Sequence, residues 1–403
     1  MGGRRHWPLP LLALVAGGLI LSLSIGTRQS FGLWLPPISA DLGWGRESFA
    51  LAIAVQNILW GVTQPVFGWA ADRWGAGRIS ALGALLYAGG IYLMGQTESV
   101  AEFHLSAGLL VGLGLSGTSF AVVLGAIGRA FPPERRSLAL GIASAGGSIG
   151  QFVMVPVGQH FIASYGWSPA LTIVAALSLT MVALSLGIAG RPAPEAAGAP
   201  PPLPAGRALG EAAVHPGYLY LTAGFFVCGF HITFIATHLP AYLVDLELTP
   251  AVAANALALI GLFNVAGSLL CGILGQKLSK KRVLAGLYAV RGIAIAAFVL
   301  TPASPWSAYV FAAVMGLTWL GTVPLTSALV AQIFGPRYLG TLFGIVFLSH
   351  QVGAFIGVWL GGRFYDLTGS YDLVWWLSIG LAAAAALLHM PIDERPVVRP
   401  RTA

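Results

Sequence analysis

The sequence contains few charged residues. Asp, Glu, Lys and Arg make up 9% of the 403 residues, whereas a soluble domain has about 25%. Hydrophobic residues make up 57%, and the mean hydropathy is +0.81. This composition excludes an ordinary soluble domain and predicts an integral membrane protein. Segments that alternate apolar and polar residues are absent, which argues against an outer-membrane barrel.

Cysteine is equally scarce. Cys228 and Cys271 both lie within apolar segments, so a disulfide framework is not indicated. The sequence also lacks a metal-ligand cluster, a phosphate-binding loop and a nucleophile elbow in a suitable context. The glycine-rich run at 112–117 lies inside an apolar segment and indicates helix packing. We therefore expect no catalytic residues, no enzymatic activity, no cofactor and no metal.

Acidic residues are missing from the apolar segments. All 14 fall in loops or at segment ends. A carboxylate inside the membrane would favour a cationic substrate, so this distribution counts against the export of cationic drugs.

The net charge of +7 does not indicate a nucleic-acid partner. With the N-terminus inside, most of the 21 Lys and Arg residues fall in segments expected to be cytoplasmic, and Arg46 and Arg363 fall on the other side. This asymmetry follows the positive-inside rule and predicts cytoplasmic termini in a cell inner membrane.

The apolar runs predict an all-α membrane protein with twelve membrane-spanning helices, since each span needs about 20 residues. The first run has no cleavage site at the expected place and is interpreted as a span, not a signal peptide. The predicted spans are 9–35, 48–70, 78–96, 102–129, 137–162, 168–190, 217–243, 252–275, 282–301, 306–333, 339–362 and 373–391.

One polar stretch divides the chain near its middle. Residues 191–216 are rich in Pro, Ala and Gly, which predicts a flexible cytoplasmic linker. The expected domains are therefore a six-helix bundle at 1–190, the linker at 191–216 and a second six-helix bundle at 217–403.

The two predicted bundles share a repeated pattern about 204 residues apart. The run GWAADRWGAGR contains Gly68, Asp72, Arg73, Gly75 and Arg78. The run GILGQKLSKKR carries a weaker copy with the same spacing, in which Gln276 replaces the aspartate. Such a long period indicates a duplicated half, and in an apolar chain it predicts a transporter with its site between the halves.

The loop motif and the layout of six plus six spans resemble the major facilitator superfamily over essentially the whole chain. The resemblance implies two six-helix bundles around a central cavity that opens alternately to each side. It also implies that the motif Gly68, Asp72, Arg73, Gly75 and Arg78 acts in gating. Asp72 is suited to capping a helix or pairing with an arginine, and Gly68 and Gly75 permit close approach and a tight turn.

Within that superfamily, the runs at 28–38, 261–272 and 334–344 are similar to the bacterial branch near monocarboxylate transporters and oxalate/formate exchangers. One departure matters for the substrate. Animal monocarboxylate carriers place an Asp and an Arg four residues apart in span 8, where this chain has Asn264 and Ser268. The arginine of that family is therefore missing at this position.

Two arginines are predicted to lie deep in the membrane. Arg28 precedes the end of its span by about 12 Å, and Arg291 follows the start of its span by about 14 Å, at 1.5 Å per residue. Without a carboxylate partner, each guanidinium requires water, backbone carbonyls or an anionic ligand, and arginine suits a carboxylate because of its paired donors. Arg28 is the stronger candidate for the substrate. For Arg291, a hydrogen bond to a neighbouring helix or a gating partner is an equal alternative.

Polar residues near the arginines complete the candidate substrate-binding set. For these residues, packing between helices remains the alternative to substrate binding. His231, His238 and His350 are also candidates for carrying a coupled proton, because histidine titrates near neutral pH. The full substrate-binding set is Arg28, Gln29, Gln56, Asn57, His231, Asn264, Arg291, Trp319, His350 and Gln351.

These observations predict a secondary transporter for a small organic anion, a mono- or dicarboxylate, driven by a proton or counter-substrate gradient. Its expected partners are the anion, the lipid bilayer and a co-transported proton, without nucleic acid, and a monomer suffices. Two alternatives stay open: an efflux pump for neutral amphipathic compounds, and a sensor with a transporter-like fold that binds its ligand without moving it.

Overall fold

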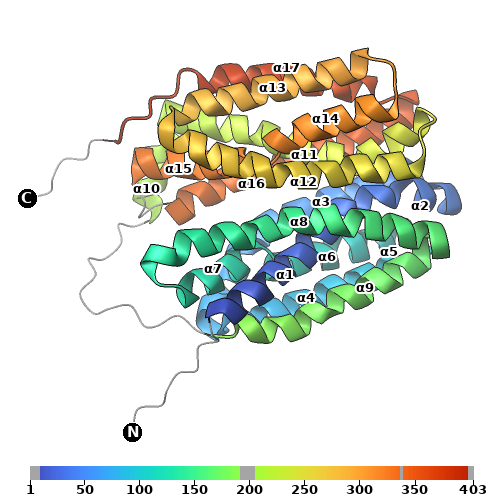
Figure 1. Ribbon diagram of the computed structural model, residues 1–403, viewed down its shortest axis with the longest axis horizontal. Coiled ribbons are helices and arrows are strands. Elements are labelled where there is room, and N and C mark those ends of the chain that lie inside the picture. The colour runs from blue at the N-terminus through green and yellow to red at the C-terminus, as the bar shows by residue number, and fades with distance from the viewer. Residues whose placement is uncertain (1–9, 191–204, 336–338, 398–403) are drawn as a thin grey trace, which may run out of the picture.

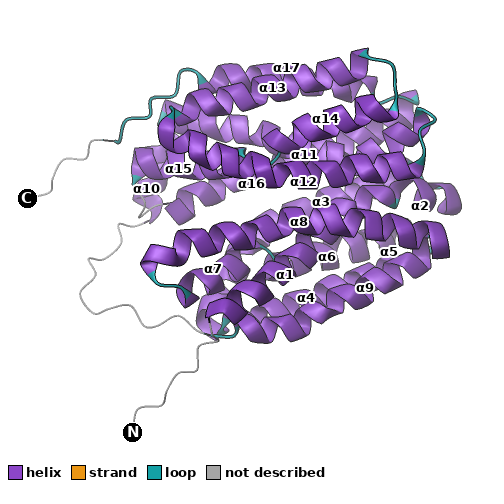
Figure 2. Ribbon diagram, viewed as in Figure 1, coloured by secondary structure: helices purple, strands orange, loops and turns teal. Residues whose placement is uncertain are grey.

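The computed structural model describes residues 10–190, 205–335 and 339–397, and within these ranges the chain forms helices and no strands (Figure 2). Among the described residues, twelve segments are long and apolar enough to cross a membrane. They agree with the predicted spans to within a few residues at most ends. The eleventh predicted span stops at 362, whereas helix α16 continues to Thr368. Charged residues in its last turns made this part resemble a loop.

The first half contains six of these segments, and several are built from shorter pieces. Its elements are α1 (Pro10–Ser30), η1 (Phe31–Leu33), α2 (Leu35–Leu42), α3 (Arg46–Trp74), α4 (Ala76–Met94), α5 (Val100–Phe103), η2 (His104–Leu110), α6 (Val111–Thr118), α7 (Phe120–Ala130), α8 (Pro133–Tyr165), α9 (Trp167–Leu184) and η3 (Ser185–Ile188).

The second half repeats this arrangement after a short helix. Its elements are α10 (Ala205–Ala213), α11 (Pro216–Asp245), α12 (Pro250–Lys277), α13 (Lys280–Leu300), α14 (Pro305–Thr318), α15 (Thr322–Phe334), α16 (Leu339–Thr368) and α17 (Asp372–His389). Figure 1 shows the two halves as two layers, with α3 and α8 of the first facing α16 and α12 of the second.

The prediction of a flexible linker over 191–216 is wrong for its last part. Residues 205–213 form α10, and its Ala212 is buried. The composition AGRALGEAA favours a helix, because alanine, leucine and glutamate have high helix propensity. Residues 191–204 lie outside the described part of the chain.

Small residues allow helices of one half to pack closely. A Cβ on Gly150 of α8 would overlap the backbone of α1 at Ser22, and one on Gly146 would lie 2.7 Å from the carbonyl oxygen of Gly18. Backbones approach this closely only where side chains are absent. Gly146 and Gly150 therefore bring α8 against α1, the helix that carries Arg28.

The two ends of the helix bundle are named here by a residue at each. The Arg46 end holds the start of α3 and the end of α11, and the Asp72 end holds the end of α3 and the start of α4. The described chain ends lie toward the Asp72 end (Figure 1).

Candidate functional site

Arg28 lies in the last turn of α1, where the helix passes into the turn η1. A positive charge is favourable there because unsatisfied carbonyls give a helix C-terminus a partial negative charge. Its Nη1 donates to Oε1 of Gln29 at 3.1 Å, and its Nη2 donates to Oδ1 of Asn57. Its Nε has no partner, and no ion pair to Arg28 occurs among the described residues. The charge is therefore solvated by two amide oxygens and left uncompensated.

Asn57 connects this guanidinium to the second half. The Nε2 atom of Gln351 in α16 donates to the Asn57 carbonyl at 3.0 Å, and Oε1 of Gln351 lies 3.0 Å from Nδ1 of His350. Arg28, Gln29, Asn57, His350 and Gln351 therefore form one polar cluster across the interface between the halves. The structure brings together these five residues of the predicted set.

Aromatic rings lie beside the cluster. The Arg28 guanidinium carbon is 5.2 Å from the ring centre of Trp60, a distance at which a cation interacts with the ring. Trp60 meets Phe347 edge to face at 5.7 Å, and Phe347 lies parallel to His350 at 5.8 Å. The indole nitrogen of Trp60 donates to Ser119 at 2.8 Å, which holds the ring in place.

Ser119 is the break between α6 and α7, where the fourth span is interrupted by one extended residue. The tenth span, its equivalent in the repeat, is interrupted between α14 and α15 at residues 319–321. Interrupted spans in transporters expose backbone groups near the binding site. Trp60 lies beside the first break, and Asn264 of the predicted set lies beside the second.

Arg291 does not join the cluster at the interface. It is 0% exposed, and its Nη2 donates to the carbonyls of Thr318 and Trp319 at the break in the tenth span. This contact is the hydrogen bond to a neighbouring helix that the sequence left as an alternative. Its Nε and Nη1 have no partner among the described residues. The structure therefore places Arg291 inside the second half as a cap on α14.

Asn264 and Trp319 meet at the same break. The Oδ1 atom of Asn264 accepts from the backbone nitrogen of Leu320 at 3.0 Å, and its Nδ2 donates to Ser148 of the first half at 2.8 Å. Trp319 is fully buried, and its indole nitrogen has no partner. Asn264 thus links the two halves, whereas Trp319 fills the core of the second half.

Three other candidates turn away from the interface. The Gln56 amide donates to the Ala107 carbonyl within the first half at 2.9 Å. His231 lies 2.9 Å from the Ser378 carbonyl of α17, and His238 lies 2.8 Å from the Val358 carbonyl of α16. Gln56 and His231 were expected to contact substrate, and His231 and His238 to be candidate proton carriers. The structure places all three side chains away from the interface, because spacing along a helix does not fix which neighbour a face meets. His350 alone of the three histidines lies in the interface cluster.

The gating motif makes its contacts within the first half. Asp72 pairs with Arg129 at the end of α7 at 3.0 Å. Gly75 connects α3 to α4 with φ +101°, a conformation that favours glycine. A Cβ on Gly68 would meet nothing within 4 Å, so the close approach expected there is not present. Arg73 lies over the Trp69 ring at 5.8 Å, and Arg78 is exposed.

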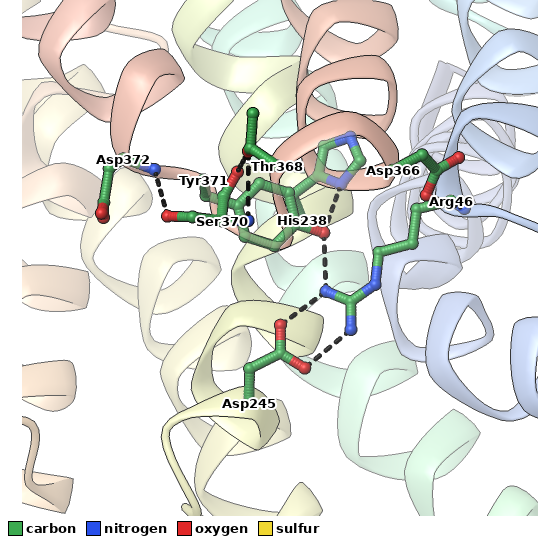
Figure 3. Close-up of polar contacts among 8 residues, drawn as sticks. All are labelled: Arg46, His238, Asp245, Asp366, Thr368, Ser370, Tyr371 and Asp372. Carbon is green, nitrogen blue, oxygen red and sulfur yellow. Dashed lines mark hydrogen bonds and ion pairs between the residues drawn. The ribbon is translucent and has the colours of Figure 1, made fainter.

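A group of charged residues that the sequence analysis did not single out joins the halves at the Arg46 end (Figure 3). Arg46 binds Asp245 through both terminal nitrogens at 2.7 Å and donates to Tyr371 at 2.9 Å. Its guanidinium carbon lies 3.6 Å from the Tyr365 ring centre. Asp366 accepts from the backbone nitrogens of Arg46 and Glu47, both at 2.8 Å.

Glu47 extends these contacts on its other side, accepting from Arg363 and from the Trp359 indole, both at 3.0 Å. We call the set Arg46, Glu47, Asp245, Trp359, Arg363, Asp366 and Tyr371 the Arg46 clasp. Tyr371 also lies 3.0 Å from Nδ1 of His238. Because the Val358 carbonyl must take a proton from Nε2, neutral His238 accepts at Nδ1 from the Tyr371 hydroxyl. His238 therefore supports the clasp from within the second half.

Hydrogen bonds and ion pairs between the halves are unevenly distributed in the described chain. They run from the middle of the bundle, at Asn57 and Asn264, to the clasp. At the Asp72 end, the ion pair of the motif stays within one half. The halves are thus fastened together at the Arg46 end.

Comparison with known proteins identifies relatives of this chain. A sequence model of the family described as Major Facilitator Superfamily matches residues 17–290 and 221–403. The chain is 25% identical to the uncharacterized MFS-type transporter YcxA of Bacillus subtilis over 90% of both chains. It is 27% identical to monocarboxylate transporter 13 of Rattus norvegicus, over 96% of this chain and 90% of that one.

Solved structures show the same fold at lower identity. A bacterial homologue of the human lysosomal transporter Spinster, in an inward-facing and unoccupied conformation, matches with a TM-score of 0.72 and 17% identity over 97% of this chain and 95% of that one. A mutant of the nucleoside transporter NupG matches with a TM-score of 0.76 and 16% identity over 95% and 99%.

Proposed function

Because the chain belongs to the Major Facilitator Superfamily, we propose that it is a secondary active transporter of a small organic anion, a mono- or dicarboxylate. One observation supports this proposal above the others. Arg28 carries a charge at the interface that no carboxylate of the described residues compensates. An anionic substrate would supply the missing charge through paired hydrogen bonds. The names of several relatives, as monocarboxylate transporters, agree with this class.

Transport would proceed by rocking the halves about the cluster of Arg28, Asn57 and Gln351. In the state described, the Arg46 clasp fastens one end, so the anion would reach Arg28 from the Asp72 end. In the opposite state the clasp would separate, and contacts of the motif around Asp72 would close the other end. The Gln351–Asn57 hydrogen bond joins the halves directly beside Arg28, so bound anion and domain movement would influence each other there.

The orientation follows from charge. Basic residues gather at the Asp72 end, which we place in the cytoplasm of a cell with the Arg46 end outside an inner membrane. The energy source would be a proton or a counter-substrate gradient. His350 is the favoured proton carrier, since it borders the cluster while His231 and His238 bond carbonyls inside the second half.

Uptake into proteoliposomes tests this function. Purified protein should carry a radiolabelled carboxylate down an imposed gradient, which a sensor would not do. The Arg28→Gln variant should lose anion flux, and Arg28→Lys should retain part of it, because lysine keeps the charge without the paired donors. Full anion flux in Arg28→Gln would overturn the proposal. Flux of neutral amphipathic compounds that survives this change would favour an efflux pump.

A further inference from the structure

The surroundings of Arg28 narrow the class of anion. We infer that the substrate is a monocarboxylate with an aromatic or similarly flat apolar body, whose carboxylate binds Arg28 and whose body lies against Trp60, Phe347 and His350. This inference rests on the proposed function, because it requires an anion at Arg28.

The number of available cations favours one carboxylate over two. Arg28 and Arg291 are the arginines deep in the described membrane segments. Arg291 is fully buried in the second half and is bound to the carbonyls of Thr318 and Trp319. The second carboxylate of a dicarboxylate would therefore lack a cation in the cluster. A buried anion without a partner is strongly unfavourable, so a single carboxylate fits the site.

The aromatic rings form a wall that begins beside the arginine. Trp60 of α3 lies 5.2 Å from the Arg28 guanidinium, and Phe347 of α16 lies 5.7 Å from Trp60. The wall continues through His350 to Phe225 of α11 at 5.0 Å. Rings from both halves thus border the position of the carboxylate, and aromatic side chains favour flat apolar partners stacked or edge-on at such distances.

The polar groups of the cluster are largely occupied, which disfavours a body rich in hydroxyl groups. The Asn57 amide donates to the Ile53 carbonyl at 2.7 Å, and the Gln351 amide donates to the Asn57 carbonyl at 3.0 Å. A sugar-like or hydroxylated body would displace these bonds or leave its own hydroxyls unpaired, and either result costs free energy. An apolar body requires neither.

One ring of the wall, Phe347, is accessible in this state, whereas Trp60, His350 and Phe225 are buried. Phe347 and Arg28 are partly exposed, whereas Asn57 and Gln351 are buried. Phe343, also partly exposed, lies one helical turn from Phe347 on α16, toward the Asp72 end. A ring entering from that end would meet Phe343 before Phe347 and would reach Arg28 last.

The affinities of a panel of small molecules for the purified full-length protein test the inference. The probes are acetate, L-lactate, benzoate and phenylacetate as monocarboxylates, succinate and terephthalate as dicarboxylates, and benzamide as the neutral aromatic control. Benzoate or phenylacetate should bind at least about 10-fold more tightly than acetate, since burying a ring of this size stabilises by roughly 1.5–3 kcal/mol. Terephthalate should bind more weakly than benzoate.

A pair of variants on one helix separates the wall from general effects. Phe347→Leu should weaken benzoate binding by about 2- to 10-fold and leave acetate binding unchanged. The control is Phe355→Leu. The Phe355 ring lies away from the wall, with its centre 6.5 Å from that of Trp359, so this variant should change the binding of neither acetate nor benzoate. Equal losses for acetate and benzoate in Phe347→Leu would contradict the inference.

The outcomes also separate the inference from the proposed function. If acetate, lactate or succinate binds as tightly as benzoate, the aromatic class is wrong and the carrier of organic anions stands. If benzamide binds and no carboxylate binds, both the aromatic class of substrate and the proposed transport of an organic anion are wrong.

Discussion

The Arg46 clasp should determine which state of the protein is populated. Arg46→Gln removes the charge that binds Asp245 and leaves a shorter, neutral polar side chain. The backbone nitrogens of Arg46 and Glu47 still bind Asp366, and Glu47 still binds Arg363. The variant therefore weakens the clasp without removing it, and its effect isolates the guanidinium.

The structure sets the size of this effect. Exposed ion pairs contribute about 0–1 kcal/mol, whereas hydrogen bonds to charged groups contribute about 1.5–3 kcal/mol. The side chains of Arg46 and Asp245 are 14% and 29% exposed, and the pair has two bonds of 2.7 Å. We expect a value in the lower part of the second range, about 2 kcal/mol, which shifts the equilibrium toward the state open at the Arg46 end by about 30-fold.

Spin-label distances measure this shift. Labels on cysteines introduced at Glu98 and Thr301, exposed at the Arg46 end of each half, report the separation of the halves. Cys228 and Cys271 are buried and would be replaced by alanine. Arg46→Gln should add a population with a longer distance between the labels, and Asp245→Asn should do the same. The double variant should show no larger effect than either single variant, because both changes remove the same ion pair.

Arg395→Gln is the matched control, because its pair with Asp393 is 4.0 Å long and 90% and 66% exposed. It should leave the distances unchanged. An unchanged distribution in Arg46→Gln would refute the conclusion that the clasp holds this end closed.

Three further predictions follow from single positions. Gly75→Ala should lower the free energy of unfolding by about 1–3 kcal/mol, because φ is +101° there, whereas thermal unfolding of Gly68→Ala should match the wild type, since its Cβ enters open space. His350→Ala should reduce proton-driven uptake in proteoliposomes and spare exchange; loss of neither would exclude His350 as the proton carrier. Arg291→Met should lower thermal stability while leaving the affinity for carboxylates within about 2-fold, because Arg291 caps α14; a large loss of affinity at unchanged stability would place Arg291 in the binding site instead.

The spans were predictable from the sequence because they depend on local composition, and the lack of an acidic partner for Arg28 was predictable because acidic residues are missing from the apolar segments. In the described part of the chain, the structure confirms twelve segments that are long and apolar enough to span a membrane. The place of Arg28 in the last turn of α1 was not predicted, because the expected span ran to 35 whereas α1 ends at Ser30.

Side-chain direction was not predictable in the same way. His231, His238 and His350 all lie in apolar spans, yet only His350 lies in the cluster at the interface, beside Gln351. The difference depends on how α11 and α16 rotate against their neighbours, which a single sequence does not encode locally. Gln56 and Asn57 are adjacent residues with opposite outcomes for the same reason.

The clasp escaped prediction because its members come from α3, α11, α16 and the turn before α17. A signal was nevertheless present. Arg46, Glu47, Asp245, Arg363 and Asp366 carry opposite charges at span ends that the topology places on one side of the membrane. The charged residues at span ends on the same side of the membrane, taken together, form this group.

Ligand-dependent thermal unfolding of detergent-purified wild type and Arg28→Gln tests the central claim most directly. A carboxylate at 100 times its dissociation constant should stabilise the wild type by about 2.7 kcal/mol if it binds only the folded state. We predict this stabilisation for carboxylates and not for their neutral amides, and its loss in Arg28→Gln. Equal stabilisation of both proteins by carboxylates, or stabilisation of the wild type by the amides alone, would contradict the claim that Arg28 binds an organic anion.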